Sequence, residues 1–243
     1  MEPQLWLTER LNHVLGAPIT ALLNAVGIHP AHPATPIDNT LAMELFVVAL
    51  ILTFFLAVRA SLSVDNPGAL QHTVEVVEEF VSEQAKGVIG HHYERYVPYA
   101  ISVGIFILVG NLLGLVPGFE SPTANPSVPL GCALVTFFYY HFYGIKQHGF
   151  GYIKQFLGPV LALSPLMLLI EVVSHLARVL SLTVRLYANM FAGDLVTVAF
   201  FSLIPVFVPV VFLGLHLGVA LIQAFSFVML TLVYLGMAVS EEH

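Results

Sequence analysis

A long apolar stretch near the C-terminal end constrains the fold of this chain most strongly. Between Gln155 and Ser240 the sequence contains only four formally charged residues, which are Glu171, Arg178, Arg185 and Asp194. The prolines at 205 and 209 divide the stretch, which predicts two helices of roughly 35–45 residues each. About 20 residues suffice to cross a bilayer. Helices this long must therefore tilt strongly, bend or run partly within the membrane plane.

The composition of the whole chain agrees with a membrane location. Of its 243 residues, 58% are hydrophobic and 9% are charged, whereas a soluble domain carries about 25% charged residues. The chain is therefore interpreted as a polytopic membrane protein in contact with the lipid bilayer. A net charge of −7 argues against nucleic-acid binding. The single cysteine, Cys132, excludes an intramolecular disulfide and is interpreted as a small apolar filler.

The hydropathy pattern predicts one all-α membrane domain over residues 1–243. It has about five transmembrane crossings plus an amphipathic surface helix, and the two long, strongly tilted C-terminal helices form an intramembrane hairpin. The segments are an interfacial N-terminal part at 1–40, spans at 41–59, 97–116 and 127–145, the surface helix at 71–89 and the hairpin at 157–240. A loop at 117–126, rich in proline, should lie outside the hydrocarbon.

The surface helix at 71–89 divides into two faces. Valines at 74, 77, 81 and 88 share one face, and glutamates at 75, 78, 79 and 83 take the other. Because an acidic face repels anionic lipid, a protein partner is favoured over a lipid-sensing role. Basic residues near this helix and in the third loop place both segments in the cytoplasm by the positive-inside rule; these residues are Arg59, Lys86, Arg95, Lys146 and Lys154. The N-terminus then lies outside, and the C-terminus lies in the cytoplasm.

Polar residues recur along one face of the first long helix. Glu171, His175, Arg178 and Arg185 are spaced i, i+4, i+7 and i+14, and Asn189 extends the stripe by one turn. Asp194 lies near the opposite face. On the last helix His216 and Gln223 share a face. In a simple hairpin, Asp194 and His216 are equally far from the bend and could approach, and Arg185 and Gln223 lie deeper at comparable distances.

Arg185 is the most informative of these residues, because its side chain stays charged at every physiological pH. A charge at membrane depth costs roughly 2.5–3.5 kcal/mol on insertion scales. No acidic residue shares its part of the stripe, which suggests a partner on another chain.

Structural alternatives stay open for the other polar residues. Glu171 could form an ion pair with Arg178, His175 could be a satisfied interior histidine, Gln223 could be an interhelical clamp, and Asp194 could be a structural partner of His216. The remaining histidines, including His141, are expected to be mostly solvated near loops or interfaces, and none has metal-ligand spacing backed by carboxylates.

Two long motifs make the family recognisable. The run at 181–194, SLTVRLYANMFAGD, and the run at 221–235, LIQAFSFVMLTLVYL, resemble subunit a of F-type ATP synthases. The loop PGFESPTAN at 117–125 resembles the bacterial form, and the terminal SEEH also fits. The resemblance covers about residues 40–243.

The resemblance implies a stator subunit in the bacterial inner membrane, beside a rotating ring of c-subunits that each carry a buried carboxylate. The c-ring, the b-subunit peripheral stalk and other ATP synthase subunits are the implied partners, and no cofactor is implied. In the family, the arginine that matches Arg185 of this chain faces the ring carboxylate. Residues of the proton path map onto Asn189, Asp194, His216, Gln223 and Glu171, and His175 lies on the same stripe. The bacterial pattern often has glutamate where this chain has Asp194, so a bridging water could complete the contact with His216.

Two rival functions belong to other classes. A self-contained secondary transporter could use Arg185 to bind an anionic substrate. An intramembrane enzyme would need a nucleophile facing a base, but Ser174 and His175 are adjacent and do not face each other on a helix. Because the chain also lacks a Gly-rich phosphate loop of the Walker type, it is predicted to be a non-catalytic subunit.

Overall fold

The computed structural model describes residues 5–25, 27, 35–63, 67–116, 118–149, 151–152, 164–203 and 207–239. The α-helices in these ranges are α1 (Trp6–Ala25), α2 (Asn39–Ala60), α3 (Ala69–Ile89), α4 (Val97–Leu113), α5 (Ser127–His148), α7 (Ser164–Leu203) and α8 (Phe207–Val239). Two short 3-10 turns, η1 (Tyr93–Arg95) and η2 (Pro122–Ala124), precede α4 and α5. The described ranges contain no β-strand.

Membrane-spanning character follows from the length and hydropathy of the helices. Four segments are long and apolar enough to cross a bilayer: Asn39–Ala60, Ser127–His148, Ser164–Thr197 and Val210–Val239. The shorter helix α4 is also apolar. The prediction of an all-α membrane protein is therefore confirmed.

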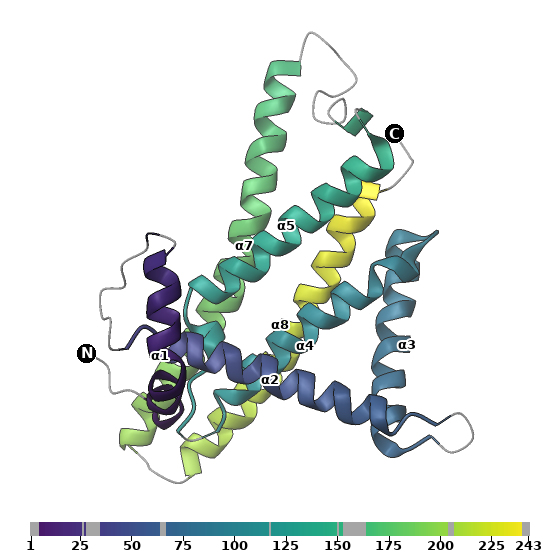
Figure 1. Cartoon of the computed structure of the whole chain (residues 1–243). Coiled ribbons are helices and arrows are strands. Elements are labelled where there is room, and N and C mark those ends of the chain that lie inside the picture. The colour runs from purple at the N-terminus through teal and green to yellow at the C-terminus, as the bar shows by residue number, and fades with distance from the viewer. Residues whose placement is uncertain are drawn as a thin grey trace.

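Helix α8 occupies the centre of the arrangement. It packs against α3, α4, α5 and α7, while α2 packs against α1 and α4 (Figure 1). Helices α7 and α8 run antiparallel, and Figure 1 shows them close together at the end where they are connected and splayed apart toward the other end. The hairpin thus holds its two long helices in contact over only part of their length.

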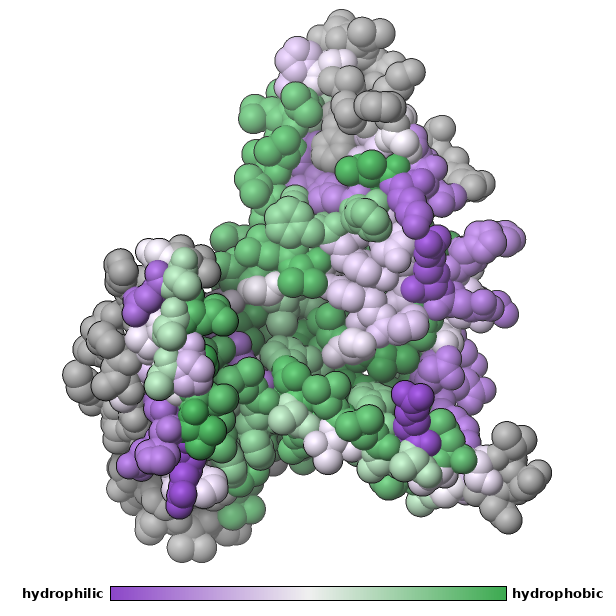
Figure 2. All heavy atoms as spheres, viewed as in Figure 1, coloured by the Kyte–Doolittle hydropathy of each residue, from purple (hydrophilic) through white to green (hydrophobic). Residues whose placement is uncertain are grey.

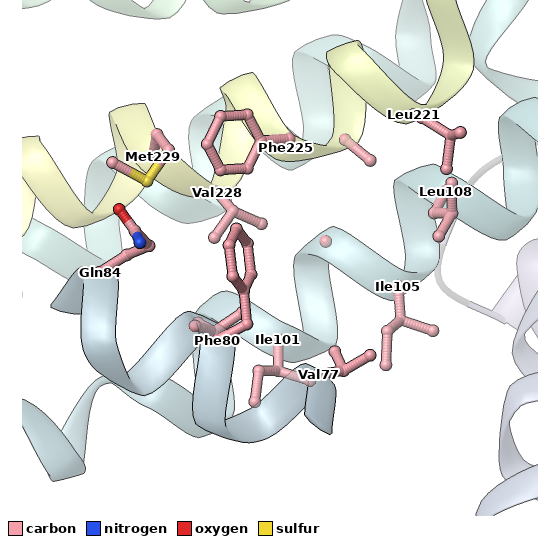
Figure 3. A pocket seen from close by; sticks show the side chains of 13 residues that line it. Val77, Phe80, Gln84, Ile101, Ile105, Leu108, Leu221, Phe225, Val228 and Met229 are labelled. Carbon is pink, nitrogen blue, oxygen red and sulfur yellow. The ribbon is translucent and has the colours of Figure 1, made fainter. Parts of the chain in front are cut away.

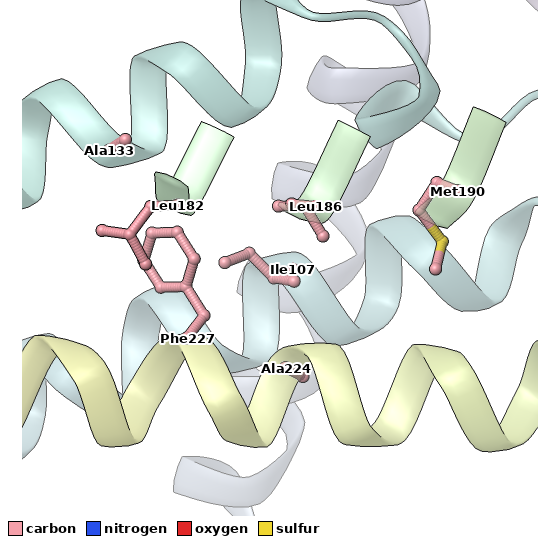
Figure 4. Close-up of a cluster of buried hydrophobic side chains, with 7 residues drawn as sticks. All are labelled: Ile107, Ala133, Leu182, Leu186, Met190, Ala224 and Phe227. Atoms are coloured by element: carbon pink, nitrogen blue, oxygen red, sulfur yellow. The ribbon is translucent and has the colours of Figure 1, made fainter. Parts of the chain in front are cut away.

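The contact between the two long helices rests on a four-residue repeat. Leu182, Leu186 and Met190 follow one another at this spacing on α7 and are nearly inaccessible to solvent. They form one apolar cluster with side chains from three other helices (Figure 4), which are Ile107 of α4, Ala133 of α5, and Ala224 and Phe227 of α8. Because this cluster fixes which face of α7 is buried, it also fixes where the polar residues of α7 point.

The long helices exceed what a perpendicular crossing requires. Helix α7 has 40 residues and α8 has 33, which correspond to lengths of roughly 60 and 50 Å against a hydrocarbon core of about 30 Å. Pro165 is the second residue of α7, where proline is tolerated because the first amides of a helix have no intrahelical acceptor. The expected bend at Pro205 and the expected entry signals Gly158 and Pro159 lie outside the described residues.

The second span is shorter than predicted because the following loop folds back onto it. Helix α4 ends at Leu113 and not at Val116. Ser121 donates a hydrogen bond to the carbonyl oxygen of Gly110 (3.2 Å), and Thr123 donates to Oδ1 of Asn111 (2.5 Å). The loop is irregular, as expected, but part of it is buried against α4 and α7.

Surface polarity differs between the helices, and α3 carries more hydrophilic surface than the four candidate spans. In Figure 2 hydrophilic surface gathers over α3 and α1, and apolar surface covers much of the region between them. On α3 the glutamates at 75, 78, 79 and 83 are exposed, whereas Val81 and Ala85 are buried against α4 and α8. The predicted amphipathic character of this helix is confirmed.

Candidate functional site

Arg185 lies on α7 outside the packed interface. Leu186 is buried in the apolar cluster, and the preceding residue is rotated about 100° around the helix axis. The side chain of Arg185 is accordingly exposed. Within the described part of the chain, no hydrogen bond or ion pair reaches its guanidinium. The sequence-based expectation that Arg185 lacks a partner in its own chain holds for these residues.

The surface around Arg185 is built from small side chains. On both sides of Arg185, residues spaced three or four positions apart share one face of α7 with it. These residues are Ser174, Ala177, Ser181, Ala188 and Ala192. All of these side chains are exposed except that of Ser174, which is half-buried. Small side chains allow the backbone of another helix to approach closely in a membrane. We call this surface the Arg185 face. Asn189, one turn after Arg185, is also exposed beside it.

Asp194 and His216 meet near the connected end of the hairpin. Oδ1 of Asp194 lies 3.7 Å from Nδ1 of His216, and the two side chains are 37% and 5% exposed. The distance is within range of an ion pair but too long for a direct hydrogen bond. Nε2 of His216 is buried without a hydrogen-bond partner among the described residues. The arrangement can therefore pass a proton between the carboxylate and the imidazole only after a small movement or through one bridging water.

Gly193 makes this approach possible. A Cβ atom at this position would lie 3.0 Å from Nδ1 of His216 and 3.1 Å from its Cε1. Because such contacts are tighter than side chains normally tolerate, an alanine here would push the imidazole away. The glycine preceding Asp194 is therefore a spatial requirement of the pair.

Gln223 lies on α8 two turns beyond His216. Its side chain is buried, with 9% exposure, on the face of α8 that packs against the other helices. No hydrogen bond joins Gln223 to Arg185 in the described part of the structure. The two residues lie at comparable depth in the hairpin, but Arg185 points to the surface and Gln223 to the interior.

A second polar cluster surrounds His175, about ten residues before Arg185. Nε2 of His175 lies 3.8 Å from Oε2 of Glu171. Nδ1 of His175 forms a 2.8 Å hydrogen bond with the hydroxyl of Tyr140 on α5. The guanidinium of Arg178 lies over the ring of Tyr234, 5.0 Å from its centroid. Glu171 therefore approaches His175 and not Arg178, so the alternative of a Glu171–Arg178 ion pair does not describe this structure.

Part of this second cluster is not evident from the sequence. The position of His141 near a loop favours a solvated side chain, but His141 is half-buried beside His175, with 4.7 Å between the two ring centroids. Its Nδ1 forms a 2.8 Å hydrogen bond with the hydroxyl of Tyr152. The missed signal is the run of aromatic and histidine residues at 137–143, which is polar on one side of an otherwise apolar span.

The two polar clusters stand on opposite sides of Arg185 along α7. His175 precedes Arg185 by ten residues and Asp194 follows it by nine, so each cluster is about 15 Å away along the helix. The structure thus presents titratable groups at two heights with a permanent positive charge between them.

A hydrophobic pocket of about 170 Å³ lies apart from both clusters, between α3, α4 and α8. Figure 3 shows Phe80, Ile105 and Phe225 among the side chains that line it. Its only side chain with polar atoms is the uncharged Gln84. Because no lining group can carry a proton, this pocket offers no route for one. Among the described residues no group of three or more potential ligands could hold a metal ion.

Comparison with known proteins assigns the family. The family model described as ATP synthase A chain matches residues 41–236. ATP synthase subunit a of Koribacter versatilis is 54% identical over 244 residues, covering 100% of both chains. The corresponding subunit of Solibacter usitatus is 49% identical and covers 96% of this chain and 99% of its own, and ATP synthase subunit a 3 of Pelobacter propionicus is 44% identical and covers 88% and 93%. The chain therefore belongs to the ATP synthase A chain family.

Proposed function

We propose that this chain is the proton-translocating stator subunit of the membrane sector of an F-type ATP synthase. Membership of the family supports a membrane subunit of ATP synthase. The finer proposal is that two offset half-channels lead protons to and from the carboxylates of a c-ring, and that Arg185 keeps the half-channels separate. In this role the chain performs no ATP chemistry itself.

The observation that carries the proposal is the position of Arg185. Its side chain is exposed, unpaired within the described part of the chain and surrounded by the small residues of the Arg185 face. A charge that stays unpaired in a membrane is costly, so a partner must supply the counter-ion. A helix bearing a carboxylate could approach the small residues closely enough to do so.

Electrostatics explains how the charge would couple proton release to movement. At about 4 Å and an effective dielectric constant near 20, attraction between Arg185 and a carboxylate is roughly 4 kcal/mol. A protonated ring carboxyl group that reaches Arg185 therefore loses its proton. Since the guanidinium cannot itself release a proton, no proton passes directly from one half-channel to the other. The carboxylate must move past Arg185 before it is reprotonated.

The two polar clusters supply the half-channels in this proposal. Asp194, His216, Asn189 and Gln223 form the access route near the connected end of the hairpin, and Glu171 with His175 forms the route at the other end. The positive-inside rule assigns the Glu171 end to the cytoplasm. It also assigns the C-terminus to the cytoplasm and the N-terminus to the periplasm of a bacterial inner membrane.

Two further partners belong to the proposal. The exposed acidic face of α3 is assigned to protein contact, because its glutamates would be repelled by anionic lipids. The b-subunit peripheral stalk and other ATP synthase subunits are the candidates. The long exposed apolar surfaces of α2 and α5 are left to the lipid bilayer and to these neighbours.

Cysteine cross-linking in the assembled complex tests the position of the ring. With Cys132 replaced by serine, a cysteine at Ala188 or Ser181 should cross-link to a cysteine in the carboxylate-bearing helix of the c-subunit. Leu52 is a matched control, because its side chain is also exposed but belongs to another helix, α2. Cross-linking at Leu52 with none on the Arg185 face would overturn the assignment. Full proton transport by the isolated monomer in liposomes would instead favour a self-contained transporter.

A further inference from the structure

The cluster around His175 contains a second histidine that the proton path described above does not use. His141 projects from α5 and His175 from α7, and their ring centroids are 4.7 Å apart. Each imidazole is bound through Nδ1 to a tyrosine hydroxyl at 2.8 Å, His141 to Tyr152 and His175 to Tyr140. Two helices and the segment after α5 thus converge on one pair of imidazoles.

The hydrogen bonds orient both rings. Burial raises the pKa of the Tyr152 phenol to about 12, against the opposing effect of Arg178, so this phenol keeps its proton at neutral pH. A phenol that keeps its proton can donate it to Nδ1 of His141 and leave the other ring nitrogen to carry the mobile proton. On His175 this other nitrogen, Nε2, is the one that faces Glu171.

A glycine on α5 shapes the same arrangement. A Cβ atom at Gly144 would lie 2.5 Å from Cε2 of Tyr152 and 2.8 Å from its Cζ. The absence of a side chain at Gly144 therefore lets the Tyr152 ring pack against α5, where its hydroxyl reaches His141 one turn away. Tyr152 itself is 5% exposed.

Charges around the pair limit how many protons it can hold. Two imidazolium rings at this separation repel each other, and Arg178 adds a fixed positive charge nearby. The carboxylate of Glu171 is the one negative charge within 4 Å of either ring among the described residues. In the part of the chain that the structure describes, the titratable or charged groups that face the pair are Glu171 and Arg178 on α7, Tyr140 on α5, Tyr152 after α5 and Tyr234 on α8.

We propose that His141 and His175 share one proton and form a relay that supplies Glu171 from the cytoplasmic side. During ATP-driven pumping, His141 takes up a proton from a hydronium ion at the cytoplasmic side and leaves a water molecule. The proton then passes to His175, so that one N–H bond breaks on His141 and one forms on His175. Finally the N–H bond at Nε2 of His175 breaks as the O–H bond of the Glu171 carboxyl group forms, which leaves both imidazoles neutral. The relay rests on the proposed function, because it supplies protons to the proposed half-channel that contains Glu171.

The pH profile of proton pumping tests the relay in the intact ATP synthase. In inverted membrane vesicles the cytoplasmic side faces the medium, so the pH of proton uptake can be set from about 6 to 9. His141→Gln should pump at nearly the wild-type rate at low pH, because protons are abundant. At higher pH, capture of protons from bulk water limits pumping by this variant. In that range each further pH unit should lower its rate roughly tenfold more than it lowers the rate of the wild type.

Two milder variants separate the relay from a structural role. Tyr152→Phe removes one hydroxyl and keeps the ring, and Gly144→Ala displaces the ring without changing any titratable group. Both should shift the profile in the same direction as His141→Gln, by a smaller amount. His91→Gln changes an exposed histidine at the turn after α3 and should leave the profile unchanged.

The results that would contradict the relay differ from those that would contradict the proposed function. A His141→Gln profile parallel to that of the wild type, whether lowered uniformly or not at all, would overturn the relay. Arg185→Ala is measured in the same vesicles. If Arg185→Ala pumps normally, the proposed function itself fails, whatever His141→Gln does.

Discussion

The close approach of Asp194 and His216 should couple the two residues energetically in proton transfer. If His216 is protonated, a unit charge pair at 3.7 Å attracts by about 4 kcal/mol at an effective dielectric constant of 20. The Asp194 side chain is 37% exposed, so screening lowers the expected coupling to about 1–2 kcal/mol. This energy corresponds to a factor of roughly 5–30 in rate.

A double-mutant cycle measures this coupling. The variants are Asp194→Asn, His216→Gln and the combination of both, each assembled into the complete ATP synthase. We expect each single variant to slow ATP-driven proton pumping roughly tenfold, as loss of a positioned proton-transfer group would. Since either loss interrupts the same path, the combined variant should be little slower than the singles.

The assay is the initial rate of fluorescence quenching of a pH-sensitive dye in inverted vesicles, normalised to the amount of assembled complex. Glu79→Gln provides the matched control for the charge change, because Glu79 is exposed on α3. Its combination with His216→Gln should be additive. Additivity of Asp194→Asn and His216→Gln within about 0.5 kcal/mol would refute a shared proton path.

Two further perturbations probe the geometry. Gly193→Ala places a Cβ atom 3.0 Å from Nδ1 of His216, so it should slow pumping, but less than Asp194→Asn does. The control Gly218→Ala adds a Cβ atom in open space and should pump at the wild-type rate. Equal pumping rates for the two glycine variants would contradict the packing argument. Thr123→Val removes the hydroxyl that donates to the buried Asn111 and should cost about 1–3 kcal/mol, seen as a lower midpoint of heat-induced loss of the assembled subunit; an unchanged midpoint would show that the loop contributes little to stability.

Hydropathy was sufficient to predict the spanning helices. Side chains that face lipid and neighbouring helices must be apolar over about 20 residues, so the segments now seen as α2 and α5 are visible in the sequence. Helix ends were less predictable. The second span stops at Leu113 because Ser121 and Thr123 return to its end, and contacts between residues so far apart leave no periodic pattern.

The candidate site also contains some contacts that the sequence predicts and others that it does not. Counting outward from the hairpin bend anticipated the approach of Asp194 to His216, because an antiparallel pair fixes which residues share a height. Helical periodicity placed Arg185 on the polar stripe, but its exposure depends on which face of α7 is buried through Leu182, Leu186 and Met190. The contacts of His141 and Tyr140 with α7 and Tyr152 could not be predicted, since they depend on the rotation of α5 against α7 and on the space left by Gly144.

The central claim is that the unpaired charge of Arg185 couples proton flow to ring movement, and charge removal tests it most directly. Arg178→Gln is the matched control, because it removes the same charge from the same helix two turns earlier, where the guanidinium already lies over Tyr234. The measurement is proton pumping per ATP hydrolysed in inverted vesicles. We expect Arg185→Gln to hydrolyse ATP without measurable pumping and Arg178→Gln to retain pumping. Normal pumping by Arg185→Gln would contradict the account.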